Sequence, residues 1–206
     1  MMESNQLALE NLSEKIKKCT ACPLYKGTTN AVPGEGDPNA KIFFIGEGPG
    51  YYEDQSGRPF VGRAGQLLEN TLEKIGLRRS QVFIGNVVKH RPPENRDPLP
   101  NEILACKGWL DQQLLIIRPK IVVTLGRFSM AKFLPSAKIS AVHGQARRVG
   151  TYIVIPMYHP AAALRGNGMM QAFQADFVKN KELLQNPDQG FTIEEDTDDT
   201  NQAKLF

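Results

Sequence analysis

Four side chains of this sequence have the chemistry of metal ligands. Cys19 and Cys22 form a C-x-x-C pair, and His90 and Cys106 follow further along the chain. Three thiolates and one imidazole could close a tetrahedral zinc site or hold an iron–sulfur cluster, and spacing alone does not separate these metals. A redox pair would need only the first two cysteines, and unrelated buried thiols are the simplest alternative. Disulfides are not expected, because three cysteines cannot pair off and a reducing cell favours free thiols or ligands.

A second chemical feature is the segment GEGPGYYEDQSGRPFVG, residues 46–62, which follows the apolar run 42–45. Its five glycines, two prolines and three carboxylates cannot pack a core, and they fix an unusual backbone whose peptide groups can approach a ligand closely. The segment therefore predicts a binding loop at the end of a strand. A dinucleotide site is the alternative, but Tyr51 stands where the G-x-G-x-x-G pattern has its last glycine.

The elements that must position these residues alternate along the chain. Apolar runs predict four buried strands, at residues 42–45, 82–88, 121–125 and 152–157. Amphipathic stretches predict helices at residues 7–17, 64–75, 101–117, 127–134 and 170–184. This order favours an α/β fold, with a mostly parallel sheet and helices on both faces. Ligands of such sheets bind beyond the carboxyl ends of the strands, so we expect segments 46–62, 89–100 and 158–165 to converge in one cleft.

Length and charge narrow the class of protein. The 206 residues, of which 41% are hydrophobic, are suited to one domain. No apolar run approaches about 18 residues and no charged-then-apolar segment opens the chain, so we expect a soluble, untargeted intracellular protein without a membrane partner. Residues 191–206 hold five acidic residues and one lysine, a net charge of −4, which leaves +7 on the rest of the chain. That basic body is compatible with a polyanionic partner, although many solvated surfaces are mildly basic.

Four motifs follow one another along the chain: CTACPLY, GEGPGYYEDQSGRPFVG, NVVKHRPPENRDPLPNEILAC and YHPAAALR. Together, from about residue 19 to about residue 185, they resemble the family 4 uracil-DNA glycosylases. The resemblance implies a three-layer α/β/α sandwich with a four-stranded, mostly parallel sheet and a [4Fe-4S] cluster. It also implies an enzyme that flips uracil out of single- or double-stranded DNA and hydrolyses its N-glycosidic bond. The alternative is a non-catalytic, cluster-bearing protein of the same fold that binds or senses nucleic acid.

The resemblance also assigns roles to residues of the predicted cleft. Phe60 matches the aromatic residue that stacks on the flipped base, and Asn86 matches the amide that pairs with uracil N3–H and O4. Cytosine has the opposite donor and acceptor pattern at these atoms, so a fixed amide rejects it. His159 matches the donor to the anionic O2 of the departing base. Backbone amides of Glu47 and Gly48 are expected on the other side of the pocket.

Two carboxylates of the loop are candidates for activating water. Other uracil glycosylase families have an aspartate where this chain has Gly48. By family position we favour Glu53 as the functional carboxylate, either aligning water or shaping the pocket near uracil C5, with Glu47 as the second candidate. The alternative for both acids is hydrogen bonding to the loop backbone.

Leu164 is the expected wedge into the gap left by the flipped base. The candidate phosphate contacts are Arg91, Arg96 and Arg165.

One predicted ligand departs from the family pattern. Most family 4 sequences have a cysteine in K-C-R-P-P, whereas this chain reads KHRPP, with His90 in that place. A histidine here also resembles the X-type uracil glycosylases, which form a covalent DNA adduct through another histidine on an inserted basic loop. That insertion is missing from RPPENRDPLP, residues 91–100. We therefore expect a [4Fe-4S] cluster held by Cys19, Cys22, His90 and Cys106, without covalent trapping.

The chain ends in a segment of different composition. We expect a glycosylase domain over residues 1–185 and an acidic, disordered tail over residues 186–206. The tail closes on QAKLF, whose Gln202, Leu205 and Phe206 resemble the motif that binds the bacterial sliding clamp. An ordinary frayed terminus is the alternative. The expected protein is a monomer of the cytoplasm, associated with the nucleoid.

Overall fold

The computed structural model describes residues 4–193, which form a six-stranded sheet in the order β1-β3-β2-β4-β6-β5. The four central strands are parallel and match the four predicted ones: β3 (Phe83–Asn86), β2 (Ile42–Gly46), β4 (Ile121–Leu125) and β6 (Tyr152–Met157). Each edge carries an antiparallel strand that the sequence did not predict, β1 (Glu35–Gly36) and β5 (Arg147–Val149). Such short strands show too little alternation to be identified from sequence.

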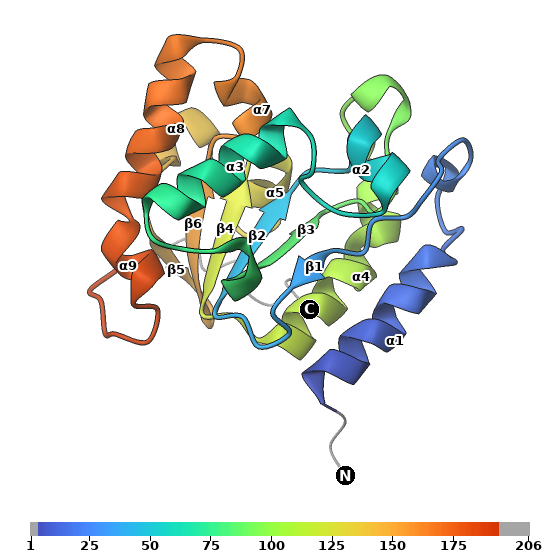
Figure 1. Ribbon diagram of the computed structural model, residues 1–206, viewed down its shortest axis with the longest axis horizontal. Coiled ribbons are helices and arrows are strands. Elements are labelled where there is room, and N and C mark those ends of the chain that lie inside the picture. The colour runs from blue at the N-terminus through green and yellow to red at the C-terminus, as the bar shows by residue number, and fades with distance from the viewer. Residues whose placement is uncertain (1–3, 194–206) are drawn as a thin grey trace.

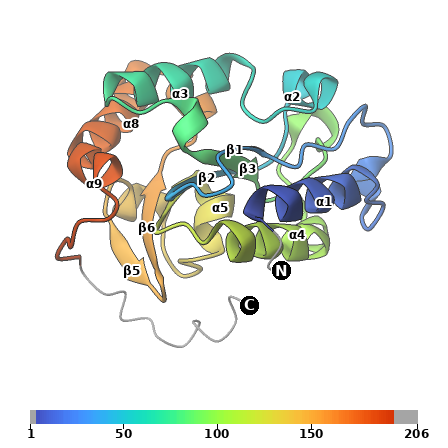
Figure 2. The same ribbon diagram turned by 60° about the horizontal axis from the view of Figure 1, so that its bottom comes forward.

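Helices cover both faces of the sheet, so the predicted α/β/α sandwich is confirmed (Figure 1, Figure 2). One face packs against α1 (Asn5–Lys17), α4 (Pro100–Ile117) and α5 (Arg127–Ala131). The other face packs against α3 (Arg63–Lys74), α8 (Asn167–Lys179) and α9 (Lys181–Gln185). Three shorter helices were not predicted: α2 (Tyr51–Ser56), α6 (Ile139–Val142) and α7 (Pro160–Ala163). Both α2 and α7 follow directly on the carboxyl end of a strand and its loop, and so lie at the edge where ligands bind.

The two faces have separate hydrophobic cores, and β2 contributes to both. Phe43 and Ile45 pack with the cluster under α1 and α4, whereas Ile42 and Phe44 pack with the cluster under α3 and α8. Successive side chains of a strand point to opposite faces. Because both faces are covered by helices, every position is apolar, which explains why the strand reads as a continuous apolar run.

Strand register brings the carboxyl ends of the central strands to one edge. Gly46 at the end of β2 pairs with Asn86 at the end of β3, and Leu125 at the end of β4 pairs with Met157 at the end of β6. The loops that follow these strands therefore share one side of the molecule, as expected for a parallel sheet.

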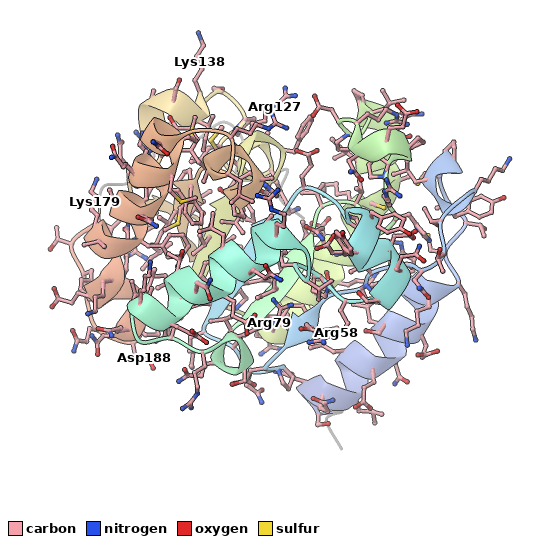
Figure 3. All side chains as sticks on the ribbon, turned by 45° about the horizontal axis from the view of Figure 1, so that its top comes forward. Arg58, Arg79, Arg127, Lys138, Lys179 and Asp188 are labelled. Atoms are coloured by element: carbon pink, nitrogen blue, oxygen red, sulfur yellow. The ribbon has the colours of Figure 1, made fainter. Side chains whose placement is uncertain are left out.

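The edge strand β1 is tied to the loop that precedes α3. Its Glu35 carboxylate forms ion pairs with Arg58 and Arg79, which lie near each other in Figure 3.

None of the described helices is long and apolar enough to cross a membrane. The predicted clamp-binding residues Gln202, Leu205 and Phe206 lie outside the described residues.

Candidate active site

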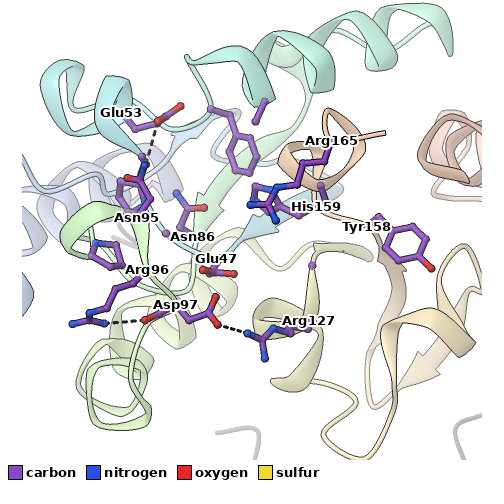
Figure 4. A pocket seen from close by; sticks show the side chains of 18 of the residues that line it. Glu47, Glu53, Asn86, Asn95, Arg96, Asp97, Arg127, Tyr158, His159 and Arg165 are labelled. Carbon is purple, nitrogen blue, oxygen red and sulfur yellow. Dashed lines mark hydrogen bonds and ion pairs between the residues drawn. The ribbon is translucent and has the colours of Figure 1, made fainter. Parts of the chain in front are cut away.

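A pocket of about 600 Å³ opens at the carboxyl ends of the strands (Figure 4). The three segments that were expected to converge all contribute to its wall. They supply Glu47, Gly48, Pro49, Gly50, Glu53, Phe60, Pro92, Asn95, Arg96, Asp97, Tyr158, His159, Ala162 and Arg165. The remaining lining residues are Ala64, Asn86, Gly126, Arg127 and Ile139. The cleft predicted from the order of strands and loops is therefore present.

Asn86 is the last residue of β3 and is only 1% exposed. Its Oδ1 atom is buried and has no hydrogen-bond partner within the described part of the chain. Buried polar atoms are nearly always paired, so an orphan in a pocket wall indicates a ligand that supplies the missing donor. Gly46, at the end of the neighbouring strand β2, leaves room for the side chains of Asn86 and Phe60. A Cβ atom at Gly46 would lie 2.4 Å from Asn86 Oδ1 and 2.6 Å from the Phe60 ring.

Phe60 forms an apolar wall of the pocket. The residue is 6% exposed, and its ring centroid lies 5.8 Å from that of His159. Its backbone has a φ of 51°, in the left-handed region that few residues other than glycine adopt. An aromatic ring beside a buried amide is the arrangement that stacks a flat heterocycle while reading its edge.

His159 stands at the N-cap of α7 and is held in one tautomer. Its Nδ1 atom accepts a hydrogen bond of 3.1 Å from the backbone N–H of Ala161. Burial lowers the pKa of His159 to about 4, so the ring is neutral at physiological pH. Because Nδ1 is the acceptor, the proton of the neutral ring resides on Nε2. A neutral imidazole that donates through Nε2 is therefore available to an anionic oxygen in the pocket.

Both oxygens of Glu53 are occupied by the backbone of its own loop. Oε2 accepts from the N–H of Gly50 at 3.1 Å, and Oε1 accepts from the N–H groups of Val61 and Gly62 at 2.9 Å each. The carboxylate thus fastens the start of α2 to the start of α3. This is the structural role that was the alternative for this acid, and it leaves little capacity for aligning water.

Glu47 is a half-buried carboxyl group on the same loop. Burial raises its pKa to about 7, the nearby Asp97 adds to the effect, and Arg127 opposes it. Asp97 and Arg127 form an ion pair at the pocket rim beside Glu47 (Figure 4). A carboxyl group that titrates near neutrality is suited to general acid–base chemistry. Neither rim residue was predicted as functional, although Asp97 lies in the segment 89–100 that was expected at the cleft.

Gly48 lines the pocket. A Cβ atom at this position would lie 2.7 Å from Val88 Cγ2. Any side chain here would therefore have to displace the backbone or Val88. The glycine is thus explained by close packing, and the expected contribution of its backbone amide to ligand binding stays a prediction.

The residues that were predicted to contact DNA differ in their exposure and in the contacts that they already make within the protein. Leu164 follows α7 and is 37% exposed, so its side chain is accessible. Arg165 lines the pocket. Arg96 donates two hydrogen bonds to the buried carboxylate of Glu102, at 2.7 and 2.9 Å, so its first role is to fasten the loop to α4. Arg91 lies over the Tyr51 ring at 5.2 Å.

None of the four predicted cluster ligands is among the residues that line this pocket. Cys22 and Cys106 are buried, Cys19 is partly buried, and Trp109 Nε1–H donates to Cys19 Sγ at 3.3 Å. Burial raises the pKa of the Cys106 thiol to about 11. Cys22 and Cys106 belong to the same buried cluster of side chains. His90 is 5% exposed and burial lowers its pKa. Among the described residues no three such side chains are spaced to hold a single metal ion.

Lys89 connects the two regions and was not predicted. It is completely buried, and its Nζ donates to the backbone oxygen of Asn86 at 2.8 Å and to Gln113 Oε1 at 2.7 Å. Gln113 Nε2 in turn donates to the backbone oxygen of Pro33 at 2.7 Å. A lysine in a sequence motif gives no sign of this, because the partners come from β3, α4 and a loop near β1.

Comparison with known proteins agrees with this arrangement. Residues 33–184 match the model of the uracil DNA glycosylase superfamily. A type-4 uracil-DNA glycosylase of Sulfurisphaera tokodaii is 48% identical over 191 residues, which cover 87% of this chain and 86% of that protein. One of Thermotoga maritima is 43% identical over 89% of this chain and 98% of that protein. A type-5 enzyme of Pyrobaculum aerophilum is 31% identical over 74% and 82%. The chain therefore belongs to the uracil DNA glycosylase superfamily.

Proposed function

We propose that the protein is a DNA repair enzyme that removes uracil by hydrolysing its N-glycosidic bond and leaves an abasic site. The observation that carries the proposal is the buried, unpartnered Oδ1 atom of Asn86 in a pocket that also contains an aromatic wall and a neutral imidazole. Uracil must leave the base stack before its glycosidic bond can be reached, so such a pocket receives a flipped base.

Asn86 supplies the selection for uracil. Its Oδ1 atom accepts from uracil N3–H, and its amide N–H donates to O4. Cytosine offers an acceptor at N3 and a donor at N4, so it would leave the buried amide and its own edge unpaired. The free-energy cost of such unpaired groups is about 1–3 kcal/mol each, enough to discriminate between the bases. Phe60 stacks on the ring of whichever base enters.

His159 stabilises the leaving group. When the bond between C1′ and uracil N1 breaks, its electron pair goes to the base and the negative charge spreads onto O2. The Nε2–H of a neutral His159 donates to that oxygen without giving up its proton, and a preorganised donor of this kind is worth about 3–4 kcal/mol. Its fixed tautomer follows from the hydrogen bond between Nδ1 and the N–H of Ala161.

Glu47 is the carboxylate that we assign to water. Glu53 had been favoured by family position, but its two oxygens hold three backbone N–H groups. Glu47 lines the same pocket with a pKa of about 7. As a carboxylate it accepts a proton from water as the water oxygen bonds to C1′, which completes the hydrolysis. Glu53 then acts as a positioning residue of the loop.

We further propose that Cys19, Cys22, His90 and Cys106 hold a [4Fe-4S] cluster. Thiolates and imidazole are ligands of such clusters. Cys22 and Cys106 belong to the same buried cluster of side chains, and Cys19 accepts a hydrogen bond from Trp109, one turn of α4 beyond Cys106. The similarity to type-4 uracil-DNA glycosylases favours an iron–sulfur cluster over zinc. When bound, it would cross-link α1's end, α4 and the segment after β3 and could carry one electron. Protein purified without oxygen should contain about four iron atoms per chain with visible absorbance. Stoichiometric zinc without iron contradicts the proposal.

Leu164 and the basic residues at the rim complete the proposed DNA interface. Leu164 enters the gap left by the base, and Arg165 and Arg91 approach the phosphates. Binding to DNA should weaken steeply as salt rises, because each neutralised phosphate releases counterions. A Leu164→Ala variant should bind free uracil normally and lose activity on duplex DNA more than on single strands, since only a duplex leaves a gap to fill.

The tail motif supports a separate proposal, that Gln202, Leu205 and Phe206 bind the sliding clamp and that residues 1–185 carry the catalytic function alone. Deleting residues 202–206 should abolish retention of the protein on immobilised clamp and leave uracil release from short oligonucleotides unchanged. A substitution Lys204→Ala, between the motif residues, is the control and should retain binding. Equal clamp binding by the deletion variant contradicts the proposal.

The central experiment is uracil release from a labelled oligonucleotide, followed by alkali cleavage at abasic sites. The wild-type protein should cleave the uracil strand and leave the matching cytosine and thymine strands intact. Asn86→Leu, which is close in size and cannot pair, should lose most activity while retaining its fold. A wild-type protein that binds DNA and carries its cluster but releases no uracil would instead be a binding or sensing protein.

A further inference from the structure

The stacking wall of the pocket depends on a backbone conformation that needs support. Phe60 has a left-handed φ of 51°, which in a residue with a side chain persists only when its surroundings hold it. The loop around it, residues 57–62, includes two glycines and a proline. Whatever holds the peptide groups at residues 59 and 60 therefore sets the direction of the ring.

Arg79 holds both of these peptide groups. Its Nη1 donates to the backbone oxygen of Phe60 at 3.1 Å, and its Nη2 donates to the backbone oxygen of Pro59. Its Nε donates to Glu35 Oε1 at 2.8 Å, so the planar guanidinium is fixed on its other edge by β1. The side chain is 15% exposed and comes from the 3-10 turn before β3, far from the loop in sequence.

The same carbonyl group is closely packed from the helix side. A Cβ atom at Gly65, in the first turn of α3, would lie 1.8 Å from the backbone oxygen of Phe60. The oxygen is thus confined between the backbone of α3 and the guanidinium of Arg79. A rigid fork that reaches two adjacent carbonyls is a property of arginine that lysine lacks.

We propose that Arg79 is a positioning residue for uracil binding, which acts by holding the carbonyls of residues 59 and 60 and so orients the Phe60 ring as the stacking wall. The inference rests on the proposed function, since it concerns the same pocket. Arg79 does not itself line the pocket, and its effect reaches the base only through Phe60.

Arg58 provides a matched control. It binds the same carboxylate, with Nε donating to Glu35 Oε2 at 2.8 Å and Nη2 to Oε1 at 3.0 Å, but its side chain is 61% exposed and it makes no contact with the carbonyls of residues 59 and 60 among the described interactions. Figure 3 shows Arg58 and Arg79 near each other. Removal of Arg58 therefore tests the ion pair with Glu35 without touching the support of the ring.

The experiment compares Arg79→Met, Arg79→Lys and Arg58→Met in the full chain by uracil release kinetics, inhibition by free uracil and thermal unfolding. Arg79→Met should raise the inhibition constant for uracil and the KM for uracil DNA about tenfold, the size of one lost stacking interaction. Its kcat should change much less, because stacking holds the base equally in the bound and transition states. Arg79→Lys should remain impaired, since one ammonium group cannot replace the fork, and Arg58→Met should stay within about twofold of wild type.

The outcomes separate this inference from the proposed function. If the wild-type protein releases no uracil, the function fails. If wild type is active and Arg79→Lys or Arg79→Met has the wild-type inhibition constant for uracil, the function stands and the role of Arg79 is wrong. Equal effects of the Arg58 and Arg79 variants would assign the effect to the Glu35 ion pairs instead. If Arg79→Met does not fold, Arg79→Lys carries the decision, because it keeps the charge.

Discussion

The uracil pocket and the cysteine region share one short segment, residues 86–90, which supplies Asn86 to the pocket and His90 to the predicted ligands. The two regions satisfy their polar groups in opposite ways. In the pocket, the Glu53 carboxylate accepts hydrogen bonds from backbone N–H groups of its own loop, and His159 accepts one from the N–H of Ala161. The exception is Asn86 Oδ1, which is buried without a hydrogen-bond partner among the described residues. In the cysteine region, Cys22, Cys106 and His90 are buried, and the partly buried Cys19 receives a hydrogen bond from Trp109. The protein thus organises the pocket by itself, whereas the proposed cluster would complete the cysteine region.

The comparison predicts that variants of the pocket and variants of the cysteine region fail in different ways. A pocket substitution should lower the rate of uracil release and leave the iron content and the unfolding temperature nearly unchanged. A substitution in the cysteine region should change iron content or stability first, and activity only as a consequence. The following substitutions are ordered from the largest expected effect to the smallest.

Replacing His159 by asparagine should lower kcat about 10²–10³-fold, the usual effect of losing one oxyanion donor. Asparagine is a good N-cap, so its side-chain oxygen can still accept from the N–H of Ala161 and preserve α7. The change therefore removes the Nε2–H donor alone. Uracil release measured at saturating DNA, with thermal unfolding and iron content as controls, checks it. A large drop in stability together with kcat would mean that His159 acts mainly as a cap.

Replacing Glu47 by glutamine should lower kcat/KM about 100-fold at pH 8, as expected for loss of a general base. In wild type the rate should rise as pH passes through about 7, where burial places the pKa of Glu47, and the variant should lack this rise. His159, with a pKa of about 4, stays neutral over this range and does not contribute. The matched variant Glu53→Gln should keep the pH dependence, because Glu53 serves the backbone.

The same pKa has a consequence for stability. The folded-state pKa of Glu47 lies above its value in the unfolded chain, so the protonated form favours folding and this contribution is lost as pH rises through about 7. Glutamine stays neutral. The Glu47→Gln variant should therefore unfold at a higher temperature than wild type at pH 8 and at nearly the same temperature at pH 5. A variant that is less stable at pH 8 would contradict the raised pKa.

Much of the pocket could be predicted from sequence because its residues follow apolar strands whose carboxyl ends must meet. Asn86 and His159 are of this kind. The roles of Glu47 and Glu53 could not be separated, since two acids of one type share one loop, and only the fold decides which carboxylate meets the N–H groups of residues 50, 61 and 62. Lys89 and Arg79 were missed for a related reason. Many of their contacts join segments that are far apart in the chain, so the local sequence pattern does not predict them.

Replacing Lys89 by methionine should destabilise the protein by about 3 kcal/mol, because two buried acceptors, the backbone oxygen of Asn86 and Gln113 Oε1, lose their donor. This change affects both regions at once. Chemical unfolding measures the loss, and Lys74→Met, at an exposed position, should change the free energy of unfolding by less than about 0.5 kcal/mol. If Lys89→Met is as stable as wild type, the two regions are not joined through this side chain.

Replacing His90 by cysteine should have the smallest effect on the enzyme and should sharpen the contrast most clearly. A thiolate is as competent a ligand as the imidazole, so the iron content should stay the same, and uracil release should remain within about twofold because the pocket is organised by its own contacts. The reduction potential should fall, since imidazole in place of thiolate raises the potential of iron–sulfur centres. A potentiometric titration monitored by visible absorbance measures the shift, and Cys106→Ala, which removes a ligand outright, should lose the iron. An unchanged potential in the His90→Cys variant would mean that His90 does not bind the cluster, whereas a loss of uracil release with iron retained would mean that the pocket depends on the cysteine region more closely than its hydrogen bonds indicate.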